Sequence, residues 1–297
     1  VIGLTIFVLF QTNLYSSAES ENESSENRTY IISMDKEALD WIRIDDTSAI
    51  NLINQLLEEE VPVSWALEDF TVDGTTYPAG TFYIETPFTT RKGITSNEVM
   101  AWLSWKGKTT RVFRISETTE EINIESREIV MPRIALFYDR TTYSNALACY
   151  NKLTEFGFKP FLVNAGDLLA DPWDDPGTAL ERANVFFMPG GAMHFWSFAT
   201  ENQRENAIKN IQQFITSGGG YVGVCAGATE TLKGSPYPYL NLVDASYHPE
   251  WFANDRDWRQ LIGPLEIGVT NEEHPVMFGY GSDSVRAVVV DADNGKE

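Results

Sequence analysis

A glycine-flanked cysteine constrains the fold of this chain more than any other feature of its sequence. Residues 217–224 form a Gly-rich turn and a short apolar strand, and Cys225 then opens a run of small residues that begins a helix. Where a strand turns sharply into a helix, the residues two places before and two places after the turn come into close backbone contact and must be glycine. Gly223 and Gly227 occupy these places. The pattern predicts a nucleophile elbow with Cys225 at its tip.

Cys225 has two interpretations on this pentapeptide alone. At an elbow, the first N–H groups and the positive dipole end of the following helix point at the sulfur, which favours a thiolate and stabilises an oxyanion. In a tight strand–helix junction of a doubly wound domain, the same cysteine is a small buried side chain with no chemistry.

Apolar strands and helices alternate through residues 132–297. A near-continuous apolar strand over 133–139 is typical of a parallel sheet covered on both faces. Further strands are expected at 161–163 and 185–188, and an amphipathic helix over 201–216 leads into the elbow strand. This alternation predicts a parallel α/β sandwich whose functional loops gather at the carboxyl ends of its strands.

Residues 30–126 predict a smaller accessory α+β domain. A helix is expected over 49–57 behind polar capping residues, then a strand over 61–66 and a hairpin over 70–84 with Asp73-Gly74 as its turn. This region has no histidine and no clustered metal-ligand spacing, so we expect an accessory or packing role.

The first residues are typical of exported proteins. Residues 1–18 predict the remnant of a signal peptide or, as the alternative, a membrane anchor, and residues 19–29 a polar linker. Either origin predicts an extracellular or cell-surface location, with a membrane contact only through that anchor. A strand is also expected over 285–291, close to the end of the given sequence.

Charge and cysteine content limit the partners. The formal net charge is −21 and no basic stripe is present, which argues against nucleic acid as a partner. The three histidines are scattered and no Cys/His cluster occurs, so no metal and no cofactor are expected. Cys149 is expected on the apolar side of a helix and not in a disulfide with Cys225. The oligomeric state is left open.

The stretch from Met188-Pro189-Gly190-Gly191 through the amphipathic helix to the elbow resembles the class I glutamine amidotransferase-like superfamily. Its nearest branch is the domain at the N-terminus of biotin–protein ligases, and the resemblance covers about residues 132–290. It implies a flavodoxin-like sheet, with oxyanion-hole N–H groups at Gly191 and Ala226. It also implies at least one more strand than the given sequence holds, so we expect the C-terminal end to be truncated. Gly190, Gly223 and Gly227 would then line the pocket. His194, three residues past Gly191, fits either a residue of the same cleft or a partly buried structural residue.

The base for Cys225 is less well defined. His248, in His-Pro-Glu, lies 23 residues after the cysteine, a spacing that is similar to the intracellular-protease-like branch but not to true amidotransferases. It fits a catalytic base or a surface loop residue. Asp139 ends the first strand of the second domain, and we expect it either to support the sulfur or to cap the next helix.

Residues 30–126 resemble the non-catalytic segment that follows the zinc-peptidase domain in some exported carboxypeptidase-like proteins. The zinc ligands of that peptidase are absent, so no peptidase activity is implied. For the whole chain we expect hydrolysis or acyl transfer by Cys225, with His248 and Asp139, on an amide, ester or reactive carbonyl. The alternative is a catalytically silent binding module that holds a small anion or a peptide end in the same pocket.

Overall fold

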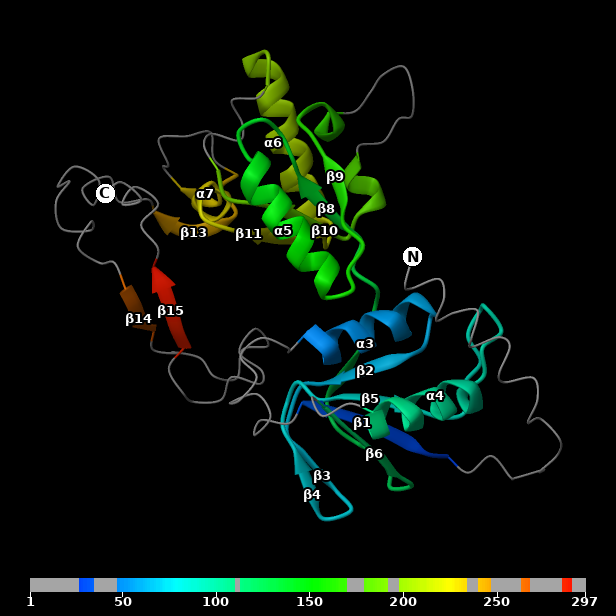
Figure 1. The fold of residues 1–297 in the computed structure, drawn as a ribbon. Helices are drawn as coiled ribbons and strands as arrows, with labels where there is room; N and C mark the ends of the chain where they lie inside the picture. Colours follow the sequence, from blue (N-terminus) through cyan, green and yellow to red (C-terminus); the bar gives the residue numbers. More distant parts are fainter. Residues whose placement is uncertain are drawn as a thin grey trace. The chain divides into compact units, whose positions relative to one another are not determined.

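The computed structural model describes residues 27–34, 47–109, 113–169, 179–191, 198–233, 240–246, 263–267 and 285–289. These residues form two compact units that divide after residue 130 (Figure 1). Unit 1 is the described chain up to residue 130, and unit 2 is the described chain from residue 131. The predicted signal or anchor segment, His194 and His248 lie outside the described residues.

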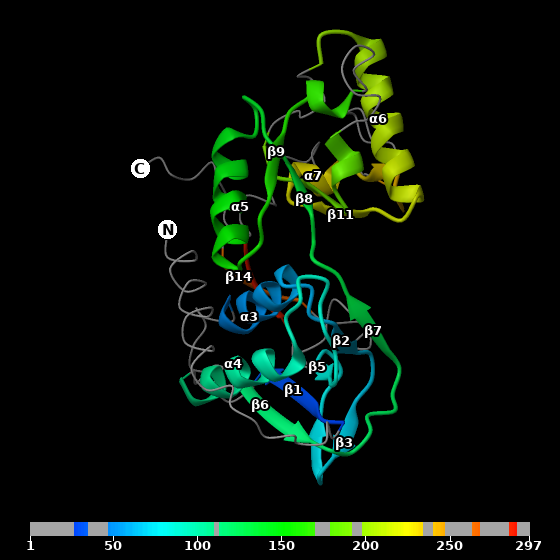
Figure 2. The same ribbon diagram turned by 90° about the vertical axis from the view of Figure 1, so that its right-hand side faces the viewer.

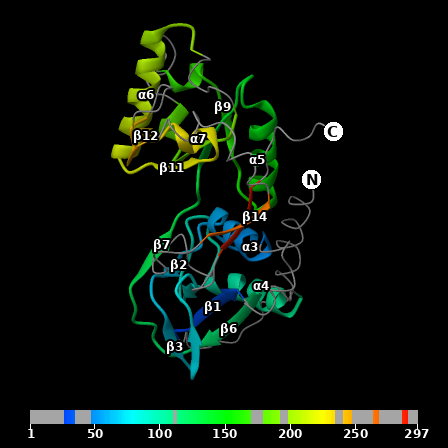
Figure 3. The same cartoon turned by 90° about the vertical axis from the view of Figure 1, so that its left-hand side faces the viewer.

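Unit 1 is built on a five-stranded antiparallel sheet of order β6-β1-β5-β2-β7. Its strands are β1 (Thr29–Met34), β2 (Val63–Ala66), β5 (Phe82–Glu85), β6 (Phe113–Thr118) and β7 (Ser126–Ile129). Helices α3 (Thr47–Glu58) and α4 (Ser96–Thr109) cover one face, and the hairpin β3 (Phe70–Val72) and β4 (Thr75–Tyr77) lies on the other (Figures 2 and 3).

The predicted helix is confirmed, and so is the hairpin over residues 70–77. Residues 82–84, expected in the same hairpin, belong instead to β5 of the five-stranded sheet. The hairpin turn has φ of 50° at Asp73 and 72° at Gly74, and positive φ at both central residues defines the type I′ turn that Asp-Gly favours. The hairpin buries Phe70, which stacks on Tyr77 with ring centroids 5.2 Å apart. Each face of the sheet therefore has its own apolar cover.

Unit 2 contains a four-stranded parallel sheet of order β11-β10-β8-β9. Its strands are β8 (Ile134–Phe137), β9 (Phe161–Val163), β10 (Val185–Met188) and β11 (Gly220–Gly223). Helix α5 (Tyr143–Glu155) follows β8, and α6 (Glu201–Thr216) joins β10 to β11 on the opposite face of the sheet (Figures 2 and 3). The predicted α/β class with a parallel sheet is confirmed.

Shorter elements complete the described part of unit 2. The 3₁₀ turns η1 (Gly166–Leu168) and η2 (Ala179–Arg182) stand between β9 and β10, and α7 (Ala226–Thr229) follows β11. Two further strand pairs come after it: β12 (Leu232–Lys233) with β13 (Val243–Ser246), and β14 (Gly263–Ile267) with β15 (Val285–Val289).

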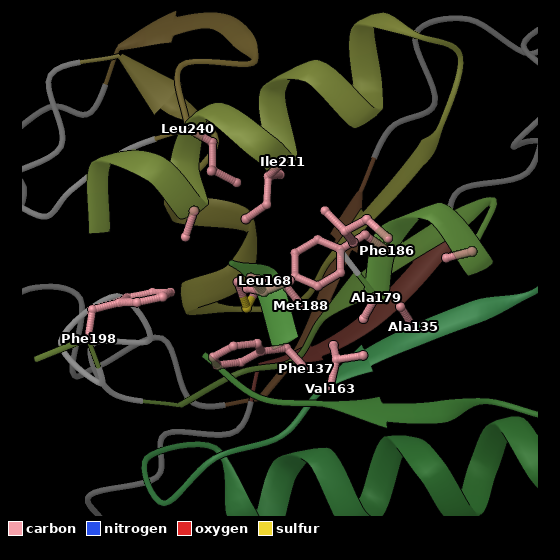
Figure 4. Close-up of a cluster of buried hydrophobic side chains, with 13 residues drawn as sticks. Ala135, Phe137, Val163, Leu168, Ala179, Phe186, Met188, Phe198, Ile211 and Leu240 are labelled. Carbon is pink, nitrogen blue, oxygen red and sulfur yellow. The ribbon is translucent and has the colours of Figure 1, made fainter. Parts of the chain in front are cut away.

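Strand β8 is buried on both faces, as its continuous apolar sequence predicts. Ala135 and Phe137 belong to the core between the sheet and α6, which also contains Phe186, Met188 and Ile211 (Figure 4). Ile134 and Leu136 alternate with them and are also buried.

Thr200 caps the start of α6, because its hydroxyl accepts a hydrogen bond from the Gln203 N–H at 3.2 Å.

We expect Leu136→Ala to lower the free energy of unfolding of unit 2 by about 2–5 kcal/mol, because Leu136 is fully buried and its truncation leaves a cavity. The matched control is Leu147→Ala on α5, where 46% of the side chain is exposed. Chemical denaturation should show a change of less than about 1 kcal/mol in the control. Equal losses in the two variants would contradict the described core.

Candidate functional site

Three loops meet at the carboxyl end of the parallel sheet in unit 2. Strands β10 and β11 pair in register from Val185 with Gly220 to Met188 with Gly223, and the Val224 N–H extends the ladder by donating to the Met188 carbonyl at 3.0 Å. The chain leaves β10 at Pro189 and leaves β11 at Cys225. Strand β8 also pairs in parallel with β10, so the loop that follows β8 begins at the same edge of the sheet.

Cys225 has the backbone conformation of a strained turn residue. Its φ is 54° and its ψ is −116°, a region that a residue with a Cβ rarely adopts, at a cost of about 1–3 kcal/mol. It occupies the N-cap position of α7, and its side chain is exposed. The interpretation of Cys225 as a small buried side chain is therefore wrong.

The two flanking glycines make the close approach that the sequence predicts. A Cβ on Gly223 would lie 2.6 Å from the Gly227 carbonyl oxygen, and a Cβ on Gly227 would lie 2.3 Å from the Met188 carbonyl oxygen. Both distances are shorter than real Cβ contacts allow. Strand β11, helix α7 and the end of β10 thus contact one another directly through backbone atoms.

The Gly190-Gly191 loop lies between Cys225 and the loop that follows β8. A Cβ on Gly190 would stand 3.0 Å from the Cys225 Cβ, so a larger residue here would collide with the cysteine side chain. Gly191 has a φ of 149°, and a Cβ there would stand 2.7 Å from the Thr141 carbonyl oxygen. The structure therefore brings Gly190, Gly191 and Cys225 to one place.

Two backbone N–H groups beside Cys225 have no protein partner within the described chain. Neither the Ala226 N–H nor the Gly191 N–H donates a hydrogen bond there, whereas the Gly227 N–H donates to the Val224 carbonyl at 3.0 Å. An N–H group with no protein acceptor is available to an oxygen of a bound molecule. These are the two residues that the resemblance implies for an oxyanion hole.

Asp139 holds the loop between β8 and α5. Its Oδ1 accepts hydrogen bonds from the Thr141 N–H at 2.8 Å, the Thr141 hydroxyl at 2.7 Å and the Thr142 N–H at 3.0 Å. Its own N–H donates to the Thr142 hydroxyl at 2.9 Å. The N-cap position of α5 belongs to Thr142 and not to Asp139, whose bonds instead order the turn that leads into the helix.

A hydrogen bond from Tyr221 connects strand β11 to helix α7. Its hydroxyl donates to the Gly227 carbonyl at 2.7 Å, and its ring packs near Phe186 with centroids 6.0 Å apart. Burial, together with the nearby buried carboxylate of Glu230, raises the pKa of Tyr221 well above its usual value. The hydroxyl therefore stays protonated and continues to donate at neutral pH.

Both cysteines have free thiols, in agreement with the expectation of no disulfide. Cys149 is only half-buried, so the expectation that it packs in the core needs correction: α5 buries Ala146 and leaves most of its surface exposed. Partial burial raises the pKa of the Cys149 thiol. At neutral pH Cys149 thus has less thiolate than a solvated cysteine.

The described residues contain no group of three or more His, Cys, Asp or Glu side chains arranged to hold a metal ion. A groove lined by η2, α6 and the Gly218-Gly219 turn lies at the amino ends of β10 and β11, away from Cys225.

The sequence does not single out Asn145, which lies in the first turn of α5. Its amide nitrogen would lie 3.6 Å from a Cβ on Gly190.

Comparison with known proteins links part of unit 2 to a protein family. Residues 139–230 match the family model described as "Biotin-protein ligase, N terminal", and this segment holds both Asp139 and the Cys225 elbow. The match covers less than half of the chain. No curated protein matches the sequence, and no solved structure matches the fold.

We expect Gly223→Ala to lower the free energy of unfolding by at least about 2 kcal/mol, because the new Cβ would collide with backbone atoms of α7. The matched control in the same strand is Gly220→Ala, whose Cβ would have its nearest neighbour at 3.6 Å. Thermal and urea unfolding should find the control at or slightly above the stability of the wild type. A destabilised control and an unaffected Gly223→Ala would contradict the described elbow.

Tyr221→Phe should reduce stability by about 1–2 kcal/mol at neutral pH, because the Gly227 carbonyl loses its donor. Above pH ~10 an unfolded tyrosine releases its proton, whereas native Tyr221 keeps it, so wild-type stability falls as pH rises. Over that range, the free energy of unfolding of the variant should fall by about 1.4 kcal/mol less per pH unit than that of the wild type. Urea denaturation from pH 8 to 12 measures both effects, and identical slopes would argue against the buried hydroxyl.

Proposed function

We propose that unit 2 is a class I glutamine amidotransferase-like domain in which Cys225 is a nucleophile for acyl transfer or hydrolysis. The observation that carries the proposal is the exposed Cys225 at a φ of 54°, next to the Ala226 and Gly191 N–H groups, which have no acceptor among the described residues. A nucleophile beside two such donors is the arrangement that acyl transfer requires.

The strand order supports this fold assignment. The sheet runs β9-β8-β10-β11, which has the order of the first four strands in flavodoxin-like sheets. In such sheets a ligand binds at the carboxyl ends of the strands, where the connections change direction along the sheet. That change falls between β8 and β10, beside Asp139 and Gly190. The family match over residues 139–230 covers the loop that follows β8 and the loop that follows β10.

The proposed reaction has two steps. The Cys225 thiol gives its proton to a base, and the sulfur bonds to the acyl carbon while the carbonyl oxygen becomes an oxyanion held by the Ala226 and Gly191 N–H groups. The oxyanion then collapses to a thioester, and the alcohol or amine leaves with the proton. Water hydrolyses the thioester and restores the thiol. We propose that the base which accepts the thiol proton is His248, which lies outside the described residues.

A catalytically silent binding module is the second candidate, and the bonding of Asp139 favours it. Because Asp139 Oδ1 is already hydrogen-bonded to Thr141 and Thr142, it has less capacity to assist a proton transfer at Cys225. The free N–H groups would then bind a small anion or the carboxylate of a peptide end.

Unit 1 is proposed to be an accessory domain, as its resemblance to the segment after a zinc peptidase implies. Export, with an extracellular or cell-surface location, remains a proposal from residues 1–18. Within the described part of the chain, no helix is long and apolar enough to cross a membrane. The proposed substrate is a small molecule or peptide, and the acidic chain argues against nucleic acid.

Rapid mixing with p-nitrophenyl acetate tests the nucleophile. In a Cys149→Ser background, we expect a burst of one p-nitrophenolate per protein and an acetyl group on Cys225 in the intact-mass and peptide spectra. Cys149→Ser/Cys225→Ala should show no burst. The reciprocal variant, Cys225→Ala alone, reports on Cys149, which should react slowly because burial raises its pKa.

A burst of equal size with and without Cys225, or acetyl groups spread over several side chains, would contradict the proposed nucleophile. Binding of acetate or a free peptide in the absence of any burst would instead support the silent binding module. Circular dichroism of each variant shows that the fold is retained.

A further inference from the structure

Asn145 reaches the proposed site from a third element. Helix α5 begins at Tyr143, and Asn145 lies in its first turn, directly after the Asp139–Thr142 loop. The three atoms nearest to the point where a Gly190 Cβ would stand belong to Cys225, Asn145 and Val224. The Cys225 Cβ is 3.0 Å from that point, and the Asn145 Nδ2 is 3.6 Å from it.

Because Gly190 has no side chain, Cys225 and the Asn145 amide both come close to the same point of the Gly190 backbone. The Asn145 side chain is exposed and forms no hydrogen bond with any residue that the structure describes. Asn151, six residues further along the same helix, is also exposed and is not among the nearest neighbours of the Gly190 Cβ position. An amide donor held beside a nucleophile and left unpaired is available to a bound molecule.

We infer that Asn145 is a substrate-binding residue of this site, whose amide N–H donates to an acceptor oxygen next to the carbon that Cys225 attacks. The substrate class is then an acyl compound with a carbonyl or carboxylate oxygen adjacent to the reacting carbon. The inference rests on the proposed nucleophilic role of Cys225. Asparagine suits this role because its N–H keeps the same protonation state across the physiological pH range.

Two alkylating probes separate the inference from the proposed function. Iodoacetamide and allyl iodide both react when the Cys225 sulfur displaces iodide from an activated carbon, and the thiol proton goes to solvent. Only iodoacetamide carries an acceptor oxygen beside that carbon. Second-order rate constants for Cys225 are measured by intact-mass spectrometry in the Cys149→Ser background.

We expect Asn145→Leu, and Asn145→Ala as a second variant, to slow iodoacetamide about fivefold, the effect of losing one hydrogen bond to the reagent. The rate with allyl iodide should change by less than about twofold. Asn151→Leu, the control on the same helix, should leave both rate constants as they are. Thermal unfolding verifies that the variants are folded.

An equal fall with both reagents, or an unchanged rate with iodoacetamide, would overturn the role of Asn145 while leaving Cys225 as a nucleophile. If Cys225 in the folded wild type reacts with neither reagent, the proposed function and this inference fail together. A selective loss with iodoacetamide in both Asn145 variants supports the inference.

Discussion

Backbone contact between Gly223, Gly227 and Met188 is the constraint on which the rest of the site depends. Any Cβ at the two glycines would overlap main-chain atoms, so β11, α7 and the end of β10 pack as closely as backbones can. That packing holds Cys225 at a φ of 54° and exposes its side chain at the edge of the sheet.

Hydrogen bonds on both sides of the elbow order the loops that surround it. The Tyr221 hydroxyl holds α7 by a hydrogen bond to the Gly227 carbonyl. Asp139 orders the turn into α5 by accepting hydrogen bonds from Thr141 and Thr142. The same turn lies against Gly191, so the loops after β8 and β10 are positioned together. A site formed this way relies on main-chain geometry more than on charged side chains, and its donors are preorganised N–H groups.

Local patterns in the sequence predict the elbow, helix α6 and the β3–β4 hairpin because steric and turn requirements act over a few residues. The Asp73-Gly74 turn and the glycines at 223 and 227 are examples. Strands β6 and β7 and helix α4 were not predicted, since their pairing and packing depend on distant partners. Asn145 was missed for the same reason: only the fold brings α5 beside Gly190. Helical spacing predicts Cys149 in the core, but nothing in the sequence shows that α5 buries so little of its surface.

The most direct test of the account is a crystal structure of unit 2, within the full chain, after reaction with a small aldehyde. The aldehyde carbon would bond to the Cys225 sulfur, and the thiol proton would move to the former carbonyl oxygen. The account predicts that this oxygen lies about 2.7–3.1 Å from the N–H nitrogens of both Ala226 and Gly191. An unmodified Cys225, or an adduct whose oxygen points away from both N–H groups, would contradict it.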